Sequence, residues 1–239
     1  MRAVILAGGR GQRLAPYTTV IPKPLLPLGD RPILDVIIHQ LAAAGIDHVT
    51  LTLGYMSDYF KVFLAQRPQL HKLMKIDFIE ETEPTGTAGS LAFVPGLDEP
   101  FLVMNGDILT DLNYRALIDQ HLESNAWLTI ATYPKPVKID LGVIESSSDG
   151  RVTDYIEKPT LNYDVSMGIY IYSPDVLGYV VKGKYLDFPT LVLRLRDAGK
   201  SVMTYRSACT WLDLGRPEDL LAATELFVDK QEQYLPKVA

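Results

Sequence analysis

Four charged residues stand where stiff backbone or an apolar strand would hold their side chains, and their types fit phosphate chemistry. Arg13 belongs to a glycine-rich stretch, and Lys23 lies between two prolines. Asp107 ends the segment FLVMNGD, and Asp213 lies inside TWLDLG. Guanidinium and ammonium groups bind phosphate oxygens, whereas carboxylates bind divalent cations. Together these residue types predict a site for a phosphorylated ligand and a metal ion.

The glycine-rich stretch LAGGRGQRL, residues 6–14, follows a compact apolar run that predicts a buried parallel strand over Arg2–Leu6. Ligands of open α/β sheets gather beyond the carboxyl ends of the strands, and glycines let backbone N–H groups approach a triphosphate. Leu14 replaces the third glycine of a dinucleotide fingerprint, and no P-loop Gly-Lys-Ser/Thr follows. The expected nucleotide contacts are Leu6, Ala7, Gly8, Gly9, Gly11 and Arg13.

Lys23 stands on stiff backbone because Pro22 and Pro24 fix φ and restrict the residues ahead of them. Taken alone, this tripeptide is more often a surface turn with a solvated lysine. The glycine stretch ten residues earlier favours a third cation placed beside the same ligand.

The two aspartates are the expected metal ligands. An isolated Asn-Gly-Asp is usually a turn, so Asp107 alone indicates little. Asp213 is more informative, because a carboxylate in an apolar strand requires a partner. Mg²⁺ takes one or two carboxylates together with phosphate oxygens and water. We therefore expect Asp107 and Asp213 to share a magnesium ion, although they are far apart in the sequence.

Composition excludes several classes of protein. The chain has 239 residues and a formal net charge of −6, which argues against a nucleic-acid partner because phosphate neutralisation needs a basic face. Its single cysteine, Cys209, rules out an intrachain disulfide and a thiolate metal cluster. No apolar run is long enough to span a bilayer or to act as a signal peptide, which predicts a cytoplasmic protein without a membrane partner. The sequence leaves open whether the chain forms a homo-oligomer.

The elements that would position these residues alternate between strands and helices in the first half of the chain. Apolar runs and amphipathic periodicity predict strands at 2–6, 48–53, 75–80, 101–105 and 127–133, and helices at 33–44, 57–65, 87–93 and 114–122. The second half predicts a meander of strands at 142–145, 152–156 and 165–172, then a helix at 189–198, strands at 202–205 and 211–214, and one long helix at 217–234.

This order predicts an α/β fold, a Rossmann-like three-layer sandwich with a mainly parallel, mixed central sheet and a β-rich half for a sugar. We expect one domain over 1–239, with a nucleotide-binding half at 1–135, a sugar-phosphate-binding half at 136–216 and a C-terminal helix within 217–239.

The combination LAGGRGQRL with IPKPLLPLGDRPIL resembles the signature of sugar-phosphate nucleotidylyltransferases, also called nucleotide-sugar pyrophosphorylases. NGD and WLDLG follow in the order that the family uses, so the resemblance covers nearly the whole chain. It implies that the glycine loop, Arg13 and Lys23 hold a nucleoside triphosphate, that Arg13, Lys23 and Asp107 are the catalytic residues, and that Asp107 and Asp213 bind the metal. Gln12 departs from the usual Thr or Ser of that loop.

The resemblance also assigns the base and sugar contacts. EETEPTGTAGS, residues 80–90, is similar to the segment that reads the base, which implies roles for Glu81, Gly86 and Thr87. An ionised Glu81 only accepts hydrogen bonds, and guanine offers adjacent N1–H and N2–H donors, so we favour GTP. LGVIE, IEKP and VSMGIYIY imply sugar-phosphate contacts, namely Gly142, Glu157, Lys158, Ser166 and Gly168. Leu141 and Ser166 replace an aromatic residue and an asparagine of the family pattern, which leaves the sugar open.

The implied reaction is the in-line attack of a sugar 1-phosphate on the α-phosphorus of the triphosphate. A phosphate monoester is largely a dianion at neutral pH, so no general base is needed. The scattered histidines are accordingly expected to be structural. The alternatives are a uridylyl-, thymidylyl- or cytidylyltransferase acting on another sugar or amino-alcohol phosphate, and a non-catalytic nucleotide-sugar sensor or regulatory subunit.

Overall fold

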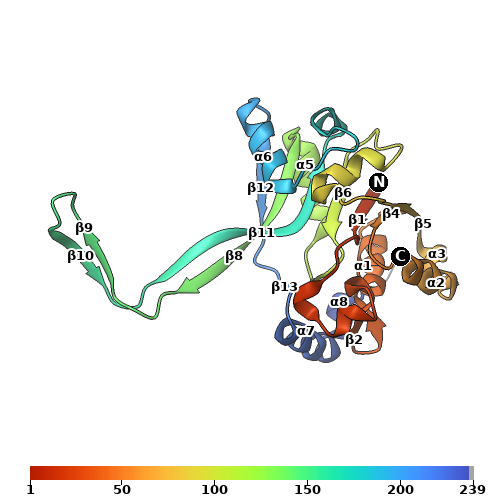
Figure 1. Ribbon diagram of the computed structural model, residues 1–239, viewed down its shortest axis with the longest axis horizontal. Coiled ribbons are helices and arrows are strands. Elements are labelled where there is room, and N and C mark those ends of the chain that lie inside the picture. The colour runs from red at the N-terminus through yellow and green to blue at the C-terminus, as the bar shows by residue number, and fades with distance from the viewer. Residues whose placement is uncertain (237–239) are drawn as a thin grey trace.

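The computed structural model describes residues 1–236, and its centre is a mixed sheet of seven strands in the order β12-β8-β11-β6-β1-β4-β5 (Figure 1). Strand β11 is antiparallel to both of its neighbours, whereas the remaining neighbours pair in parallel. The mainly parallel, mixed sheet predicted from the sequence is therefore confirmed. The strands are β1 (Arg2–Leu6), β4 (His48–Leu53), β5 (Lys75–Glu80), β6 (Phe101–Asn105), β8 (Leu128–Lys138), β11 (Thr160–Tyr172) and β12 (Val202–Arg206).

Helices cover both faces of the sheet, and strand β1 shows why. Its side chains alternate between two separate apolar cores, with Ala3 and Ile5 in one and Val4 in the other, and all three are fully buried. The first core is covered by α1 (Ile33–Ala43), α2 (Ser57–Ala65), α3 (Pro68–Leu73), α5 (Tyr114–Ser124) and α7 (Pro217–Asp229). The second is covered by α4 (Gly86–Gly89), the 3₁₀ segments η4 (Ser90–Phe93) and η5 (Pro174–Tyr179), and α6 (Phe188–Asp197).

The C-terminal region differs from its expectation. One helix was predicted over 217–234, but the structure breaks it at Lys230, whose φ of −131° and ψ of 37° are not helical. A short helix α8 (Gln231–Tyr234) follows, and its Tyr234 is fully buried in the first core. Burying that ring requires the chain to turn, which a straight continuation of α7 would not allow. Residues 237–239, the end of the expected C-terminal segment 217–239, lie outside the described residues.

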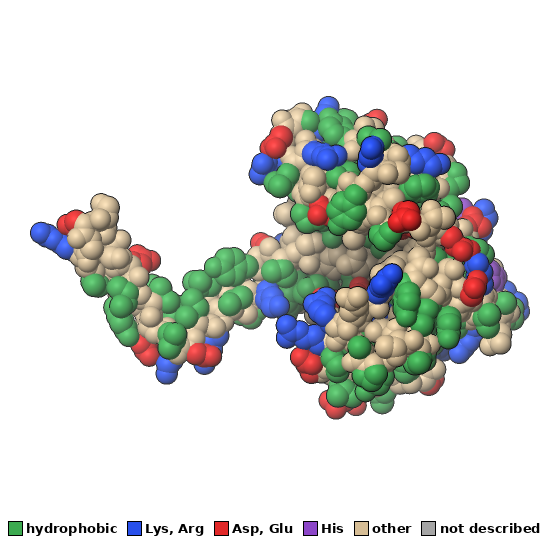
Figure 2. All heavy atoms as spheres, in the orientation of Figure 1, with side chains coloured by type: hydrophobic (Ala, Val, Ile, Leu, Met, Phe, Trp, Pro, Cys, Tyr) green, Lys and Arg blue, Asp and Glu red, His purple; other side chains and the backbone are tan. Residues whose placement is uncertain are grey.

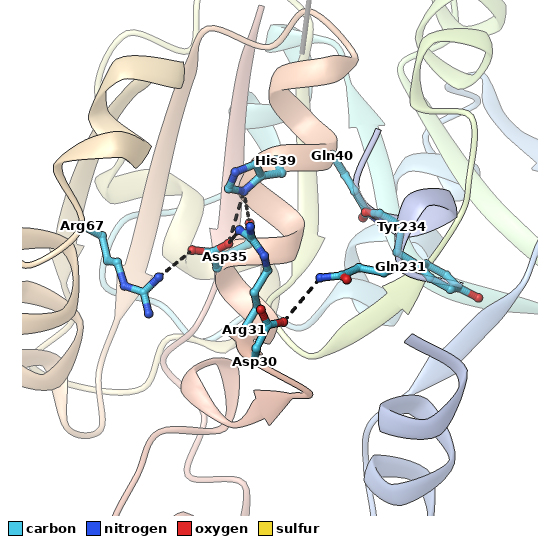
Figure 3. A network of polar contacts seen from close by, with 8 residues as sticks. All are labelled: Asp30, Arg31, Asp35, His39, Gln40, Arg67, Gln231 and Tyr234. Atoms are coloured by element: carbon cyan, nitrogen blue, oxygen red, sulfur yellow. Dashed lines mark hydrogen bonds and ion pairs between the residues drawn. The ribbon is translucent and has the colours of Figure 1, made fainter. Parts of the chain in front are cut away.

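A buried carboxylate network holds the first turn of α1 (Figure 3). Asp35 is fully buried, and its Oδ1 accepts a hydrogen bond of 2.7 Å from Arg31 Nη1. His39 Nδ1 lies 3.3 Å from the same oxygen, and Arg67 Nη1 lies 3.7 Å from Oδ2. The surrounding cations compensate the cost of burying this charge.

One further side chain of α1 ties distant segments together. Gln40 is buried, and its Nε2 donates to the carbonyl of Thr110 at 2.7 Å. It also donates to the carbonyl of Tyr234 at 3.0 Å; Figure 3 shows Gln40 beside Tyr234. Thr110 ends the short strand β7 (Ile108–Thr110), which directly follows Asp107. Helix α1 therefore supports the backbone that carries one of the predicted metal ligands.

Strands β8 and β11 run much further than predicted and leave the body as a two-stranded ribbon (Figure 1). The strand predicted over 127–133 stops before the prolines at 134 and 136, but in the structure these prolines pair with Asp164 and Asn162 inside the ladder. Because the two prolines are two residues apart, their nitrogens face the same edge of the ribbon. A missing N–H donor costs little on an edge that has no further partner strand.

We call residues 134–165 the arm. Beyond the β8–β11 ribbon it ends in a second hairpin, β9 (Val143–Ser146) with β10 (Val152–Ile156). Within this described segment no residue is buried, so the arm has no core of its own. In the described part of the chain, residues 1–236, no helix has the length and apolar character needed to cross a membrane.

Candidate active site

The glycine loop begins where β1 ends and folds tightly because two of its glycines have close neighbours. Gly11 has a φ of +61°, and a Cβ there would lie 2.9 Å from Thr18 Cγ2. Gly8 packs beside the backbone of Gly54, which follows β4. The 3₁₀ turn η1 (Gln12–Leu14) comes next and buries Leu14. This burial leaves Arg13 at the open edge of the sheet.

Lys23 begins the 3₁₀ turn η3 (Lys23–Leu25) and is only 7% exposed. Its ammonium group forms an ion pair with Asp107, and its Nζ lies 3.9 Å from Asp213 Oδ1. A buried lysine requires such partners, since desolvation of an isolated ammonium group is costly. The lysine therefore points toward the two carboxylates rather than into solvent.

Asp107 and Asp213 are brought together by a small antiparallel pair of strands. Strand β13 (Trp211–Asp213) pairs with β7 so that Asp213 lies opposite Ile108. One residue further along the chain, the backbone N–H of Leu214 donates to the carbonyl of Asp107 at 3.1 Å. Burial, followed by the charge of Asp107, raises the pKa of Asp213 above its usual value, against the opposing effects of Lys23 and Arg13. A carboxyl group that faces a second carboxylate in this way is suited to share a cation.

A cavity of about 520 Å³ lies at the carboxyl ends of β1 and β6. Of the residues predicted from the sequence it is lined by Leu6, Ala7, Gly9, Gly11, Arg13, Lys23 and Asp107. Arg10 and Gln12 also line it. Arg10 lies near the Tyr55 ring, with its Cζ 6.0 Å from the ring centroid. The cavity therefore collects two arginines, a lysine and a carboxylate around one glycine loop.

Three lining residues were not singled out from the sequence, namely Pro24, Gly106 and Gly215. Gly106 lies so close to β1 that a Cβ would be 3.1 Å from the carbonyl oxygen of Leu6. A Cβ at Gly215 would be 3.3 Å from both Arg13 Nη2 and Asp213 Oδ2. Gly106 directly precedes Asp107, and Gly215 lies two residues after Asp213, so the motifs NGD and WLDLG themselves contained this signal.

The predicted base-reading residues lie beside the loop but do not line the cavity. Glu81 Oε2 accepts hydrogen bonds from the Thr85 hydroxyl at 2.6 Å and from its N–H at 3.3 Å. Its Oε1 would lie 3.7 Å from a Cβ built on Gly8, so the carboxylate adjoins the glycine loop. Gly86 and Thr87 pack against residues 186–188: a Cβ at Gly86 would meet the Leu186 carbonyl oxygen at 2.5 Å, and the Thr87 hydroxyl accepts from the Phe188 N–H.

The five predicted sugar-phosphate residues fall into two groups. Ser166 and Gly168 lie where the arm joins the body, and Gly168 is so near Asn105 that a Cβ would be 2.6 Å from its Nδ2. Gly142, Glu157 and Lys158 lie on the arm. No residue of the described arm lines the cavity. The structure thus gathers most of the predicted loop residues, Lys23 and Asp107 around one cavity, whereas Gly142, Glu157 and Lys158 lie away from it.

A model of the nucleotidyl transferase family matches residues 2–230. The chain belongs to this family. Its match covers the glycine loop, Lys23 and both aspartates, so the residues that converge on the cavity all lie inside the family's domain.

Relatives agree with this membership. A mannose-1-phosphate guanyltransferase of Emericella nidulans is 30% identical over 237 residues, which cover 95% of this chain and 64% of that protein. The chain therefore spans less than two thirds of that relative's length. HddC from Yersinia pseudotuberculosis is 28% identical, with a TM-score of 0.72 over 95% of this chain and 99% of that one.

Solved structures extend the comparison. HddC has also been solved in complex with GMP-PN, and that structure is 27% identical to this chain with a TM-score of 0.71, covering 95% of this chain and 99% of that chain. A putative glucose-1-phosphate thymidylyltransferase from Bacillus anthracis shares the fold, with a TM-score of 0.77 at 22% identity over 98% of each chain.

The donor set at the cavity fits a hard divalent cation. Within residues 1–236 no group of three or more His, Cys, Asp or Glu side chains is arranged around a metal position. Two facing carboxylates beside a cavity suit Mg²⁺, which is usually held by one or two carboxylates with substrate phosphates and water completing its shell. Asp107 and Asp213 are the residues that would hold it.

Proposed function

We propose that this protein transfers a nucleotidyl group, with GTP as the favoured donor, to a sugar 1-phosphate and releases pyrophosphate. The observation that carries the proposal is the cavity beside the glycine loop, which Arg13, Lys23 and Asp107 line, with Asp213 Oδ1 3.9 Å from Lys23 Nζ. The names of the fungal relative and of the HddC complex support a guanine nucleotide and a phosphorylated sugar.

In the proposed reaction an oxygen of the sugar phosphate attacks the α-phosphorus in line. A new P–O bond forms, the bond from the α-phosphorus to the bridging oxygen breaks, and pyrophosphate carries away the electron pair. The attacking phosphate is already largely a dianion at neutral pH, so no side chain has to remove a proton. A bound Mg²⁺ would supply charge neutralisation at the phosphates.

The chain's own residues contribute by orientation and electrostatics. The glycine loop presents backbone N–H groups, and Arg13 offers a planar fork of donors for phosphate oxygens. Lys23 contributes a second positive charge from a rigid, largely buried position. Residues 1–135 would serve the nucleotide and residues 136–216 the sugar phosphate.

The preference for guanine rests on Glu81. Its carboxylate adjoins Gly8 of the loop and accepts hydrogen bonds only. Guanine presents two neighbouring N–H donors, whereas uracil and thymine present one N–H between acceptors. Thr85 holds one carboxylate oxygen in place, which fixes the side chain beside the loop.

A panel of the four ribonucleoside triphosphates and dTTP, each combined with several sugar 1-phosphates, tests the proposal through pyrophosphate release in magnesium. We expect GTP with one hexose or heptose 1-phosphate to give the highest kcat/KM. Preference for a pyrimidine triphosphate would overturn the base assignment, and nucleotide binding without turnover across the panel would indicate a sensor instead.

A further inference from the structure

Arg10 lines the cavity together with Arg13 and Lys23, but it differs from both in its surroundings. Lys23 forms an ion pair with one of the two aspartates. A Cβ on Gly215 would lie 3.3 Å from both Arg13 Nη2 and Asp213 Oδ2, so these two side chains lie close together. In the described part of the chain, Arg10 forms no ion pair with a carboxylate. Its charge is therefore available to a ligand of the cavity.

An aromatic ring holds the Arg10 side chain at the rim of the cavity. The Cζ atom of Arg10 lies 6.0 Å from the centroid of the Tyr55 ring, within the range of a cation–π contact. The Tyr55 N–H donates to the Gly8 carbonyl at 3.4 Å, which ties this ring to the glycine loop. A Cβ on Gly9 would meet no atom within 4 Å, so the loop position beside Arg10 leaves open space. Figure 2 shows Lys and Arg side chains around a hollow in the body next to the base of the arm.

The order of the strands places Arg10 on the side of the loop away from the expected sugar phosphate. Strands β11, β6, β1 and β4 are consecutive neighbours in the sheet. Gly168, an expected sugar-phosphate contact, belongs to β11, and Asp107 lies just after β6. The glycine loop follows β1, and Tyr55 lies just after β4. Because Arg10 contacts the Tyr55 ring, its guanidinium group lies on the β4 side of the loop.

The geometry of the proposed reaction gives this side a role. In an in-line displacement the attacking and leaving groups lie on opposite sides of the reacting phosphorus. A sugar phosphate that approaches from the β11 side therefore expels pyrophosphate toward the β4 side. The proposed base contact Glu81 adjoins Gly8 at the start of the loop, whereas Arg10 is exposed two residues further on. The base and the leaving phosphates thus meet different parts of this side.

The charge of the leaving group calls for a cation in this position. A terminal phosphate carries about −1.5 to −2 charges at neutral pH, and the bridging oxygen keeps the electron pair when its bond to the α-phosphorus breaks. The charges of Lys23 and Arg13 are opposed by those of the two nearby aspartates. Arg10 adds a planar fork of donors that matches phosphate oxygens.

We propose that Arg10 binds the β- and γ-phosphates of the triphosphate and stabilises the charge that develops on them as they leave as pyrophosphate. Tyr55 is the positioning residue that holds the Arg10 guanidinium group beside them. This inference rests on the proposed function, to which it adds a residue for the leaving group. In the reverse reaction the same arginine binds the incoming pyrophosphate.

A series of ligands tests the contact without requiring turnover. Isothermal titration calorimetry in magnesium compares the binding of GMP, GTP and inorganic tripolyphosphate to the wild type and to Arg10→Gln. We expect the variant to bind GTP and tripolyphosphate about 10-fold more weakly or worse, and GMP with unchanged affinity. Arg196→Gln is the matched control, because it removes the same charge from an exposed arginine on α6 and should leave all three affinities unchanged. Equal weakening of GMP and GTP, or an unchanged GTP affinity in Arg10→Gln, overturns the proposal.

A double-mutant cycle tests the role of Tyr55. Tyr55→Leu should weaken GTP binding by about 2- to 5-fold, whereas Tyr55→Phe keeps the ring and the wild-type affinity. In the Arg10→Gln background Tyr55→Leu should have no further effect, because the ring acts through the arginine. A loss that persists in that background would show that the ring supports the loop by itself and would remove Tyr55 from the proposal.

Kinetics separate this inference from the proposed function. Arg10→Gln should lower kcat by about 10-fold or more and raise the KM for pyrophosphate in the reverse direction. If the wild type transfers the nucleotidyl group but Arg10→Gln changes neither constant, the role of Arg10 is wrong and the proposed function stands. If the wild type turns over none of the tested substrates, the proposed function fails, while the ligand series still decides whether Arg10 binds the outer phosphates. If another triphosphate is preferred, it and its monophosphate replace GTP and GMP in the series.

Discussion

Lys23 lies between Asp107 and Asp213, forming an ion pair with the first and placing its Nζ 3.9 Å from Oδ1 of the second. The two carboxylates come from strands β7 and β13, which meet only through tertiary pairing. Because Lys23 is nearly buried, these carboxylates replace the water that would otherwise solvate its charge. A change to any one of the three therefore alters the charge balance that the other two experience.

Asp107→Asn is expected to lower kcat by at least about 100-fold while the protein stays folded, comparable to losing one preorganised electrostatic contact. Asparagine preserves the size of the side chain and the backbone bond from Leu214, but it removes the negative charge of a proposed metal ligand. Steady-state kinetics beside a thermal melt check this expectation. Full activity in the folded variant would contradict the metal assignment.

Asp213→Asn is expected to raise the melting temperature in the presence of a chelator at neutral pH. The folded protein raises the pKa of Asp213 above the usual 3.8, so the ionised carboxylate destabilises the fold at pH values above that range, and this penalty disappears as the pH falls. Adding Mg²⁺ should stabilise the wild type but not the variant. Equal stabilisation of both proteins by Mg²⁺ would remove Asp213 from the metal site.

Gly86→Ala is expected to destabilise the protein by about 2–5 kcal/mol, because a left-handed backbone is combined with a steric clash. Its φ is +83°, and the added Cβ would lie 2.5 Å from the Leu186 carbonyl oxygen. Gly45→Ala is the matched control, since its φ is +84° but no atom lies within 4 Å. Urea unfolding should show only about 1–2 kcal/mol of destabilisation for Gly45→Ala. Equal losses in the two variants would show that the contact with Leu186 is unimportant.

The network around Asp35 predicts a pH dependence of stability. The hydrogen bond that the His39 ring donates to the Asp35 carboxylate raises the pKa of His39 above 6.5. Protonated His39 therefore stabilises the fold below about pH 6.5, and this contribution is lost as the pH rises through the higher folded pKa. The free energy of unfolding of His39→Gln should therefore vary less with pH above that value. His71→Gln, at an exposed histidine, should keep the wild-type profile. Identical profiles for the wild type and His39→Gln would exclude this linkage.

The same network predicts how the stability of the fold changes at acidic pH. Burial raises the pKa of Asp35, but hydrogen bonds from His39 and Arg31 outweigh it and hold the pKa below the usual 3.8. The stabilisation is therefore complete above about pH 4 and is lost as the pH falls through the folded pKa. Asp35→Ala should cost about 3–5 kcal/mol at pH 6, as expected when one partner of a buried ion pair is removed. Chemical denaturation measures this cost, and a loss below about 1 kcal/mol would contradict it.

Glu81→Gln is expected to lower kcat/KM for GTP by about 10-fold or more relative to the other triphosphates, since the amide group replaces one acceptor with a donor. Thr85→Val keeps the carboxylate and removes only the hydroxyl that holds it, so it should lower the same preference by less than Glu81→Gln. A competition assay with mixed triphosphates measures the preference. An unchanged preference in Glu81→Gln would place base recognition elsewhere.

The sequence predicted well those features that depend on short stretches. The apolar run of β1 and the glycines after it predicted a loop at the sheet edge, and Asp107 followed a run that becomes β6. The sequence-based prediction was wrong about where two elements end, because the local pattern there was compatible with two structures. The strand predicted over 127–133 continues in the structure through the prolines at 134 and 136, which an unpaired ribbon edge accepts. The single helix predicted over 217–234 is broken where Tyr234 becomes buried.

By itself the sequence determined the fold class, the glycine loop and the residue types of a phosphate site, because apolar periodicity, glycine backbone freedom and proline stiffness act over a few residues. Only the tertiary structure decided that Asp213 meets Asp107 and Lys23, because that contact depends on the pairing of β13 with β7. It also placed Glu157 and Lys158 on a projecting arm instead of beside the cavity. Strand periodicity specifies which face of a strand is apolar, but not which surface will cover it.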